Sequence, residues 1–438
     1  MKGSWEDLYE DLRSKLGLSK RHAIDLGPRE REALIRATDA LREKFVLNVV
    51  GKDELAKARA WIREVGKCVE ELRALLGVKC VFYTRELKSF ISDPLAHLKK
   101  KIFVYTFDLL TGKIEPWQFE RKASAAIRTS LRTNMRSIYQ TWVFFKLLSL
   151  IASEEPSKLI HPEHGSLYVE RSGRQRLGLI PPNCVISGLS GALSFFLEVP
   201  RPIAWEDSRD LASVWKFYVA LRPDMMVYGG VVMDIADPPS DPPIKKPDFI
   251  VECKELDDWY GRVRDLKGQL SKPLSAEEWR FLWLKGLWDG LADAMGVKRK
   301  EVIRMFREER SIRLREPQLV QLYRSVYRPD EMALVSRARV PGEVRDELEA
   351  HGIKVYDDVG FRPERLEELA HELLSKARPA GEADLLAEVA SILGLKQFDR
   401  EALRKVLLEL VREEADVLRK RLSASGPSDE GMRKYPGT

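Results

Sequence analysis

Two acidic residues and a lysine near the middle of the chain have types and spacing that suit chemistry at phosphorus. In the segment IVECKEL, Glu252 and Lys254 alternate with Val251 and Cys253, so a strand would turn both charged side chains to one face. A buried strand tolerates such a pair only where the two meet a cavity, a metal ion or each other. Asp224 lies 28 residues earlier in RPDMMVY, and two adjacent antiparallel strands would bring it beside Glu252.

This set of residues predicts metal-assisted hydrolysis of a phosphodiester bond. Such hydrolysis needs a hard divalent cation, Mg²⁺ or Mn²⁺, held by carboxylate oxygens with positions left open for phosphate and water. Asp224 and Glu252 supply those oxygens, and the main-chain carbonyl of Cys253 is a further candidate ligand. Lys254 would orient the attacking water or help to deprotonate it, and would stabilise charge at phosphorus. The alternative is a structural ion pair of Glu252 with Lys254 or Arg222.

Two other groupings invite a metal interpretation but are not favoured. Asp248 and Glu252 are four residues apart on one predicted strand and cannot provide opposed ligands. His161 and His164 in HPEH are expected in a surface loop, and no third ligand follows at a convincing spacing.

The elements around the predicted site favour an α/β fold. Runs rich in β-branched and aromatic residues are bounded by glycine and proline, and a proline-rich stretch, 237–247, is expected as a loop between two of them. Next come a predicted helix, strand, helix and strand, an order suited to a partly parallel sheet. The predicted strands are 166–170, 183–199, 213–235, 247–256, 332–338 and 353–359, and the last helices are 317–328 and 344–352.

RPD followed by a strand, a turn and ECK resembles the PD-(D/E)XK motif of the restriction-endonuclease-like nuclease superfamily, with some similarity to McrBC-type restriction nuclease subunits. The resemblance covers roughly 130–360. It implies a restriction-endonuclease-like mixed sheet flanked by helices, and a Mg²⁺- or Mn²⁺-dependent (endo)deoxyribonuclease with a 5′-phosphate product, acting in defence against foreign DNA or in DNA repair. The segment SIYQTWVFFKLL resembles the first core helix, where many relatives carry a metal-binding glutamate. Gln140 stands at the matching position, so we count it among the candidate catalytic residues although an amide is a weaker metal ligand.

Two alternatives to catalysis by this chain alone stay open. One is a catalytically inactive nuclease fold that serves as a nucleic-acid-binding platform. The other is a subunit of a larger DNA-processing complex, because the sequence has no phosphate-binding loop of its own and an ATPase or helicase partner would supply the motor. A homodimer is a further expectation for an enzyme that cuts both strands of DNA.

A long helix predicted from 116 to 152 carries a basic stripe near its start. Residues 128, 132 and 136 are four apart and stack on one helical face, and 121–136 contains no acidic residue. Such a stripe can line a phosphate backbone, whereas the alternative is a solvated helix face. The candidate nucleic-acid-binding residues are Arg121, Lys122, Arg128, Arg132 and Arg136.

The segment 291–306, LADAMGVKRKEVIRMF, matches a helix-turn-helix pattern. Ala292 packs the first helix, Gly296 forms the turn and Val302 is the buried aliphatic residue of the second helix. Packing of an ordinary helical hairpin is the alternative, and the nearby tryptophans are expected in a core. The second helix would present Lys298, Arg299, Lys300 and Arg304 to DNA.

Composition and patterning suggest how the rest of the chain is organised. We expect a helical N-terminal domain at 1–115, a nuclease-like domain at 116–365 with a helical insertion at 258–316, a helical extension at 366–422 and a disordered tail at 423–438. The net charge is +6, and no stretch has the length and apolarity of a membrane span. With four scattered cysteines and no secretory signal pattern, the sequence predicts a cytoplasmic protein without disulfides. Three Asn and seven Gln among many charged residues are typical of thermophile proteins.

Overall fold

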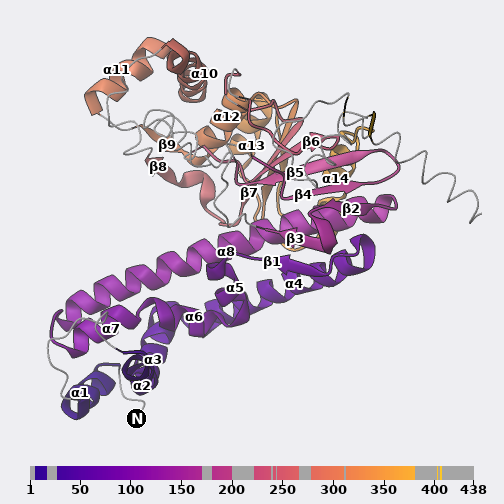
Figure 1. The fold of residues 1–438 in the computed structure, drawn as a ribbon. Coiled ribbons are helices and arrows are strands. Elements are labelled where there is room, and N and C mark those ends of the chain that lie inside the picture. The colour runs from indigo at the N-terminus through magenta and orange to yellow at the C-terminus, as the bar shows by residue number, and fades with distance from the viewer. Residues whose placement is uncertain are drawn as a thin grey trace, which may run out of the picture. The chain divides into compact units, whose positions relative to one another are not determined.

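The computed structural model describes residues 5–16, 27–169, 180–199, 221–237, 240–242, 244–265, 278–309 and 312–379, with 402, 405 and 406. The chain divides into two compact units, 1–379 and 380–438. All elements discussed below belong to the first unit (Figure 1). The tail predicted at 423–438 and most of the extension predicted at 366–422 lie outside the described residues. The predicted domain boundaries stay predictions.

Seven helices precede residue 115 in the described part of the chain. An edge-to-face contact between Trp5 and Phe45 and a tilted contact between Phe45 and Phe119 hold the first of them on the long helix that follows. The helices are α1 (Trp5–Leu16), α2 (Pro28–Ala37), α3 (Asp39–Val50), α4 (Lys52–Leu76), α5 (Arg85–Ser92), α6 (Pro94–Lys101) and α7 (Phe103–Leu110).

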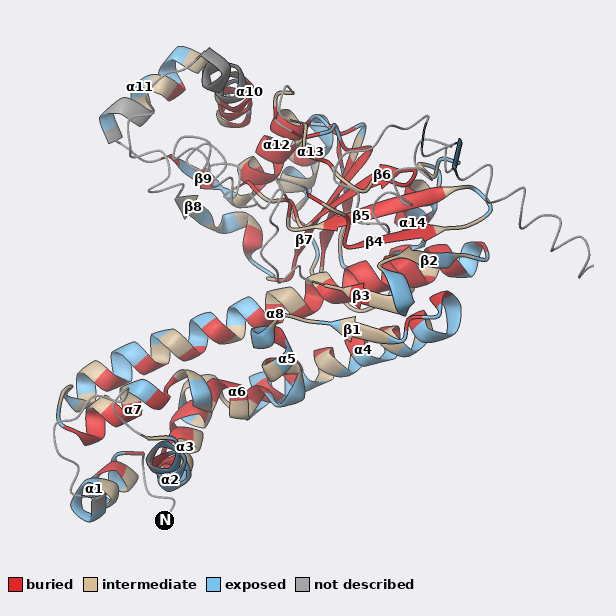
Figure 2. Ribbon diagram, viewed as in Figure 1, coloured by how far each residue is buried: buried red, intermediate tan, exposed pale blue. Residues whose placement is uncertain are grey.

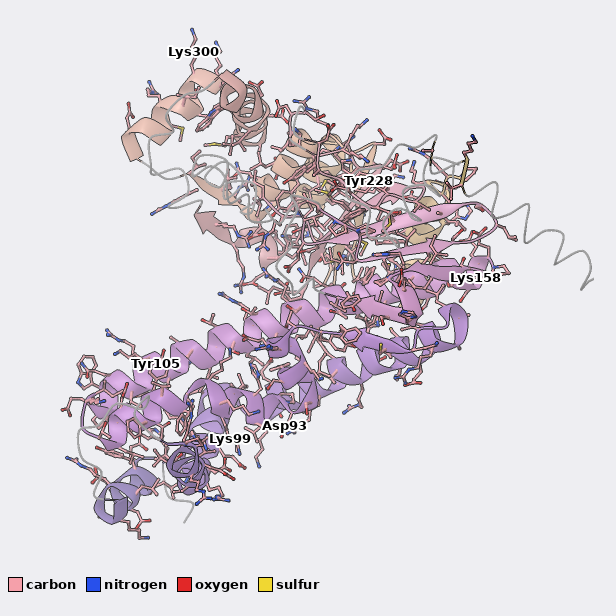
Figure 3. All side chains as sticks on the ribbon, in the orientation of Figure 1. Asp93, Lys99, Tyr105, Lys158, Tyr228 and Lys300 are labelled. Atoms are coloured by element: carbon pink, nitrogen blue, oxygen red, sulfur yellow. The ribbon has the colours of Figure 1, made fainter. Side chains whose placement is uncertain are left out.

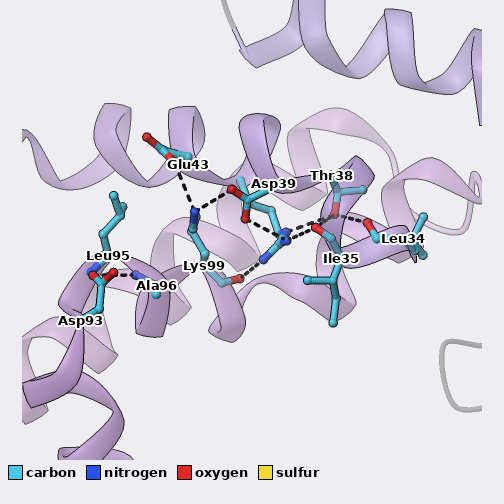
Figure 4. A network of polar contacts seen from close by, with 10 residues as sticks. Leu34, Ile35, Thr38, Asp39, Glu43, Asp93, Leu95, Ala96 and Lys99 are labelled. Carbon is cyan, nitrogen blue, oxygen red and sulfur yellow. Dashed lines mark hydrogen bonds and ion pairs between the residues drawn. The ribbon is translucent and has the colours of Figure 1, made fainter. Parts of the chain in front are cut away.

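A polar network joins α3 to α6 (Figure 4). Lys99 Nζ donates to Asp39 Oδ2 at 2.8 Å and to Glu43 Oε2 at 3.2 Å. The buried guanidinium of Arg42 donates to Thr38 Oγ1 and to the carbonyl of Lys99, each at 3.2 Å. Because each buried donor has a polar partner here, the charge of Arg42 is tolerated between the helices.

Helix α8 (Pro116–Glu154) connects the N-terminal helices to the sheet. Its first half is exposed along one side, and its second half is almost entirely buried (Figure 2). The buried run includes Ile138, Trp142 and Phe145, which pack between α4 and the sheet. The helix predicted at 116–152 is therefore confirmed, with its end two residues later.

The main sheet is mixed and has seven strands in the described residues, in the order β11-β10-β7-β6-β5-β4-β2. β11, β10 and β7 are parallel to one another, whereas β7, β6, β5, β4 and β2 pair antiparallel. The α/β class predicted from the sequence is confirmed at this level. The strands are β2 (Lys158–His161), β4 (Cys184–Ser187), β5 (Ala192–Leu197), β6 (Met225–Gly229), β7 (Phe249–Lys254), β10 (Glu331–Ser336) and β11 (Ile353–Tyr356).

Helices cover both faces of this sheet. Val251 and Cys253 of β7 pack into the core under α8, α4 and α14 (Glu367–Leu374). Ile250 points to the opposite core, which is formed by α10 (Glu278–Met295), α12 (Glu316–Tyr327) and α13 (Gly342–Ala350). The alternation expected along β7 is thus present, and Glu252 and Lys254 share the parity of Ile250.

Two small sheets lie apart from the main one. β1 (Cys80–Phe82) pairs in parallel with β3 (Ser166–Tyr168), and β8 (Val263–Asp265) pairs antiparallel with β9 (Arg313–Arg315). The expectation of a wholly helical 258–316 was therefore wrong at both ends. Within that range, α10 and α11 (Arg299–Glu309) form a helical hairpin inserted between two three-residue strands. Short 3₁₀ turns lie at Glu163–Gly165, Trp259–Gly261 and Pro363–Arg365.

None of the helices in the described ranges is long and apolar enough to cross a membrane.

Candidate functional site

Asp224 and Glu252 meet where β6 begins and β7 approaches its end. The two strands pair with Met225 opposite Val251, which places Asp224 next to the ExK segment. The main-chain N–H of Asp224 donates to Glu252 Oε2 at 3.1 Å, and the N–H of Cys253 donates to Asp224 Oδ2 at 2.8 Å. Antiparallel pairing across the proline-rich loop therefore brings the two predicted carboxylates together.

Lys254 lies in the middle of a buried charge network. Its ammonium donates to Glu252 Oε1 at 2.9 Å and to Glu316 Oε2 at 2.8 Å. It also lies 5.7 Å from the centre of the Trp259 ring. Arg264 Nε approaches Glu316 Oε1 at 3.7 Å. The exposed fractions of Glu252 and Lys254, 4% and 8%, show that both charges are withdrawn from water.

The pKa values of Asp224 and Lys254 are both raised, which favours a neutral carboxyl at Asp224 and a charged ammonium at Lys254. Burial raises the pKa of Asp224 well above its usual value, and the negative charge of Glu252 raises it further, against the opposing charges of Lys254 and Arg136. Burial lowers the pKa of Lys254, but the carboxylates of Glu252 and Glu316 outweigh it, so the net pKa is raised and the ammonium form is favoured. The cluster therefore holds a carboxyl that resists ionisation beside a lysine that resists deprotonation.

Helix α8 contributes two polar side chains to this site. Gln140 Nε2 donates to Asp224 Oδ1 at 2.6 Å, so in this arrangement Gln140 acts as a hydrogen-bond donor to the carboxylate. Arg136, one turn earlier, acts electrostatically on Asp224, Glu255 and Glu316. Its Nε atom is buried and has no hydrogen-bond partner among the described residues. A buried guanidinium nitrogen without an acceptor is a natural donor to a bound anion.

The remaining predicted nucleic-acid-binding residues lie on two helices outside this cluster. Arg121, Lys122, Arg128 and Arg132 are exposed on the first half of α8, and Arg121 covers the ring of Trp117. On α11, Arg299 lies 3.4 Å from Asp289, and Arg304 lies 3.8 Å from Glu301. Lys298 and Lys300 are exposed, and Lys300 projects outward from the helix (Figure 3).

The helical hairpin matches the predicted turn pattern. Gly296 has φ +64° between α10 and α11, a conformation that suits glycine, and Val302 is fully buried. Ala292 is 9% exposed and belongs to the same core as Val302. The hairpin packs through α10 on α12, so packing explains these residues without DNA.

The disfavoured groupings have local explanations. Asp248 accepts from the N–H of Gly229 at 2.8 Å and pairs with Arg378. His161 is the last residue of β2, and the side chain of His164 is exposed. Arg222 lies 3.8 Å from Glu198. The Glu252–Lys254 ion pair exists, but it does not explain why Asp224 is placed against it.

Sequence reasoning missed Glu316 and Arg264. Glu316 is the first residue of α12 and reaches Lys254 from 62 positions away, so no local spacing links the two. Burial raises the pKa of Glu316, but Lys254 and then Arg264 more than offset this, and the net pKa is lowered. The one available signal was the acidic residue in LREPQ, at a predicted helix start, which is a common position for glutamate.

The donor set at Asp224 fits a divalent cation. Two carboxylates lie side by side, and after burial the negative charge of Glu252 is the next cause of the raised pKa of Asp224, so a cation bound by both would relieve that repulsion. In the described part of the chain, no group of three or more His, Cys, Asp or Glu side chains is arranged around a common point. A third protein ligand would therefore be a main-chain oxygen, for which the carbonyl of Cys253 is the candidate.

Comparison with models of known protein families finds no match, and neither curated proteins nor solved structures give a significant match.

Proposed function

We propose that this chain is a metal-dependent nuclease with a restriction-endonuclease-like core. The observation that carries the proposal is the convergence of Asp224, Glu252 and Lys254 at one end of β6 and β7, linked by hydrogen bonds, with Glu252 and Lys254 buried and Asp224 half-buried. Buried charges are costly unless they are paired, bind a ligand or take part in a reaction, and Asp224 has no cation within hydrogen-bond distance among the described residues. The resemblance of RPD and ECK to the PD-(D/E)XK motif supports the same conclusion.

Asp224 and Glu252 would hold Mg²⁺ or Mn²⁺, with the carbonyl of Cys253 as a further ligand. When bound, the ion polarises the phosphate and makes a bound water more acidic. Lys254 acts as an ammonium rather than as a base, because its raised pKa keeps its proton. It orients the water and stabilises charge on the phosphate oxygens. Glu316 positions Lys254, and Arg136 offers a donor to a phosphate oxygen.

DNA is the proposed substrate, with the exposed arginines of α8 as a backbone track leading to Arg136. The basic residues of α11 are a second candidate surface. Assembly as a homodimer and docking to an ATPase or helicase are part of the proposal for a defence or repair role. The second candidate function is a binding platform without catalysis. Gln140 favours it, since it presents a donor where many relatives present a metal-binding carboxylate.

The test is cleavage of single- and double-stranded DNA and RNA with Mg²⁺, Mn²⁺ or EDTA. Wild type is compared with Asp224→Ala, Lys254→Ala and, as a control, Glu32→Ala on the exposed face of α2. We expect metal-dependent DNA cleavage that falls at least about 100-fold in the two site variants and is unchanged in the control. Absence of cleavage by wild type on every substrate, with DNA binding intact, would favour the platform instead.

A further inference from the structure

The β8–β9 ribbon has two faces with different partners. Val263 lies opposite Arg315, and Arg264 lies opposite Leu314. Directly opposite residues of an antiparallel pair share a face, and residues two apart on a strand do so as well. Val263, Asp265, Arg313 and Arg315 therefore belong to one face, with Asp265 opposite Arg313, and Arg264 and Leu314 belong to the other.

The inner face fixes the ribbon to the candidate active site. Leu314 is fully buried, and Arg264 reaches Glu316, the carboxylate that also holds Lys254. The N–H of Glu316 donates to the carbonyl of Arg262 at 3.0 Å. The ribbon is thus tied by main-chain and side-chain contacts to the network around Lys254, and its outer face is held at a set position beside that network.

The outer face borders an open hollow of about 540 Å³, lined by Val263, Arg313, Arg315 and Gln318. Both arginines are exposed, and Val263 is 60% exposed, an unusual value for a β-branched residue on a strand. Arg315 lies 3.5 Å from Glu347, and its guanidinium carries five N–H donors. Two guanidinium groups on β9 with an apolar side chain beside them on β8 match a phosphate-sugar backbone.

We propose that the outer face of the β8–β9 ribbon binds the phosphodiester backbone of the nucleic acid beside the phosphate that is cleaved. Two adjacent residues have different roles: Glu316 holds Lys254 at the reaction centre, and Arg315 lines the hollow. Arg264 of the ribbon acts electrostatically on Glu316, Glu252 and Asp224, so the ribbon lies beside these carboxylates. The nucleic-acid strand would pass between the arginines of the ribbon and Arg136 of α8. This inference rests on the proposed function for the identity of the substrate.

The experiment measures binding rather than cleavage. Labelled single- and double-stranded oligonucleotides are titrated by fluorescence anisotropy in EDTA over a range of salt concentrations, with the full chain. The test variant is Arg313→Gln/Arg315→Gln. The matched control is Arg59→Gln/Arg63→Gln, which removes the same charge at two exposed arginines of α4. Arg313→Lys/Arg315→Lys keeps the charge and loses the planar fork.

We expect the glutamine pair at the ribbon to weaken binding at least about tenfold and to reduce the slope of log K against log salt by about 1.4 to 1.8, the loss of two phosphate contacts. The lysine pair should recover the slope but not the full affinity, which also shows that the ribbon tolerates substitution. Binding and slope equal to those of the α4 control would overturn the inference. So would displacement of the oligonucleotide by polyglutamate at equal charge, because the surface would then select an acidic peptide.

The outcome is separable from that of the cleavage test. If the ribbon variant loses binding and the wild type never cleaves, the inference is supported and the proposed nuclease activity is ruled out. If the wild type cleaves and the ribbon variant binds normally, the inference is ruled out and the proposed nuclease activity stands. A wild type that binds no oligonucleotide in EDTA overturns the inference by itself.

Discussion

The residues around Lys254 leave Asp224 without a cation in hydrogen-bond contact among the described residues. Lys254 pairs with both Glu252 and Glu316, and Arg264 adds a second cation beside Glu316, so the charges of these four residues balance. Among the residues that the structure describes, the donors within hydrogen-bond distance of the Asp224 carboxylate are uncharged, namely Gln140 and the N–H of Cys253. An aspartate held in this way stores free energy that a bound cation can release. Function at the site and stability of the ligand-free chain are therefore opposed.

This opposition predicts that Asp224→Asn stabilises the ligand-free protein at neutral pH. Asparagine removes the half-buried charge, its oxygen still accepts from Cys253, and the amide of Gln140 can rotate to offer its own oxygen. We expect a rise in the unfolding midpoint of about 2 °C or more in EDTA, since removing about 1 kcal/mol of strain has an effect of that size. Scanning calorimetry measures it, and Mn²⁺ should raise the midpoint of wild type but not of the variant.

The sign of the pH dependence follows from the raised pKa of Asp224. A folded-state pKa above the unfolded value means that the folded chain retains the proton longer, so stability is present at low pH and is lost as pH rises. The advantage of Asp224→Asn should therefore be absent near pH 4 and grow as the pH passes through the raised pKa. A variant less stable than wild type at pH 7, with the same folded structure, would contradict this account of Asp224.

At the scale of elements, β5 and β6 are held in place by a close approach of the chain at 376–378. The N–H of Ala192 donates to the carbonyl of Arg378 at 2.8 Å, beside the start of β5. A Cβ on Gly229, the last residue of β6, would lie 2.1 Å from the carbonyl oxygen of Lys376. Only a glycine permits this contact, and the same segment brings Arg378 to Asp248.

Gly229→Ala is accordingly expected to destabilise the protein by about 1 to 3 kcal/mol, because the clash is with main chain and cannot be relieved by rotating a side chain. The control is Gly66→Ala in α4, where a Cβ meets nothing within 4 Å. That change should stabilise by about 0.5 to 1 kcal/mol through helix propensity. Urea unfolding measures the free energy of unfolding of both variants. An unchanged value for Gly229→Ala would mean that 376–378 can move away from β6 at no cost in stability.

The sequence predicted those elements whose periodicity is long and regular. α8, α12, α13 and the strands β7, β10 and β11 all follow expected patterns, because each buries a repeating apolar face. β8 and β9 were missed because three-residue strands rich in arginine have no readable period. The site followed the same rule. Alternation and a short chain separation placed Asp224, Glu252 and Lys254, whereas Glu316 and Arg264 join through tertiary contacts that no spacing records.

At the scale of the whole molecule, some charges form networks alongside the many isolated pairs within single helices. Glu331 of β10 contacts both Lys354 of β11 and Lys376, and Lys354 also contacts Glu372 of α14. Networks of this kind lose less conformational entropy per contact than isolated pairs, and their desolvation becomes less costly on heating. Together with three Asn and seven Gln in 438 residues, they favour a protein adapted to high temperature.

We therefore expect thermal unfolding of the intact chain above about 80 °C, some 20 to 40 °C above mesophile domains. The contribution of the network is tested with Glu331→Gln, which should lower the midpoint by roughly 2 °C, because two lysines lose a shared partner. Glu32→Gln removes an isolated exposed pair with Arg36 and should change it by less than about 1 °C. Calorimetry at two salt concentrations separates the causes, since the effect of Glu331→Gln should shrink as salt screens the network. An unfolding midpoint in the mesophile range would show that the scarcity of Asn and Gln reflects composition alone. Equal effects of Glu331→Gln and Glu32→Gln would show that the network adds nothing beyond ordinary surface pairs.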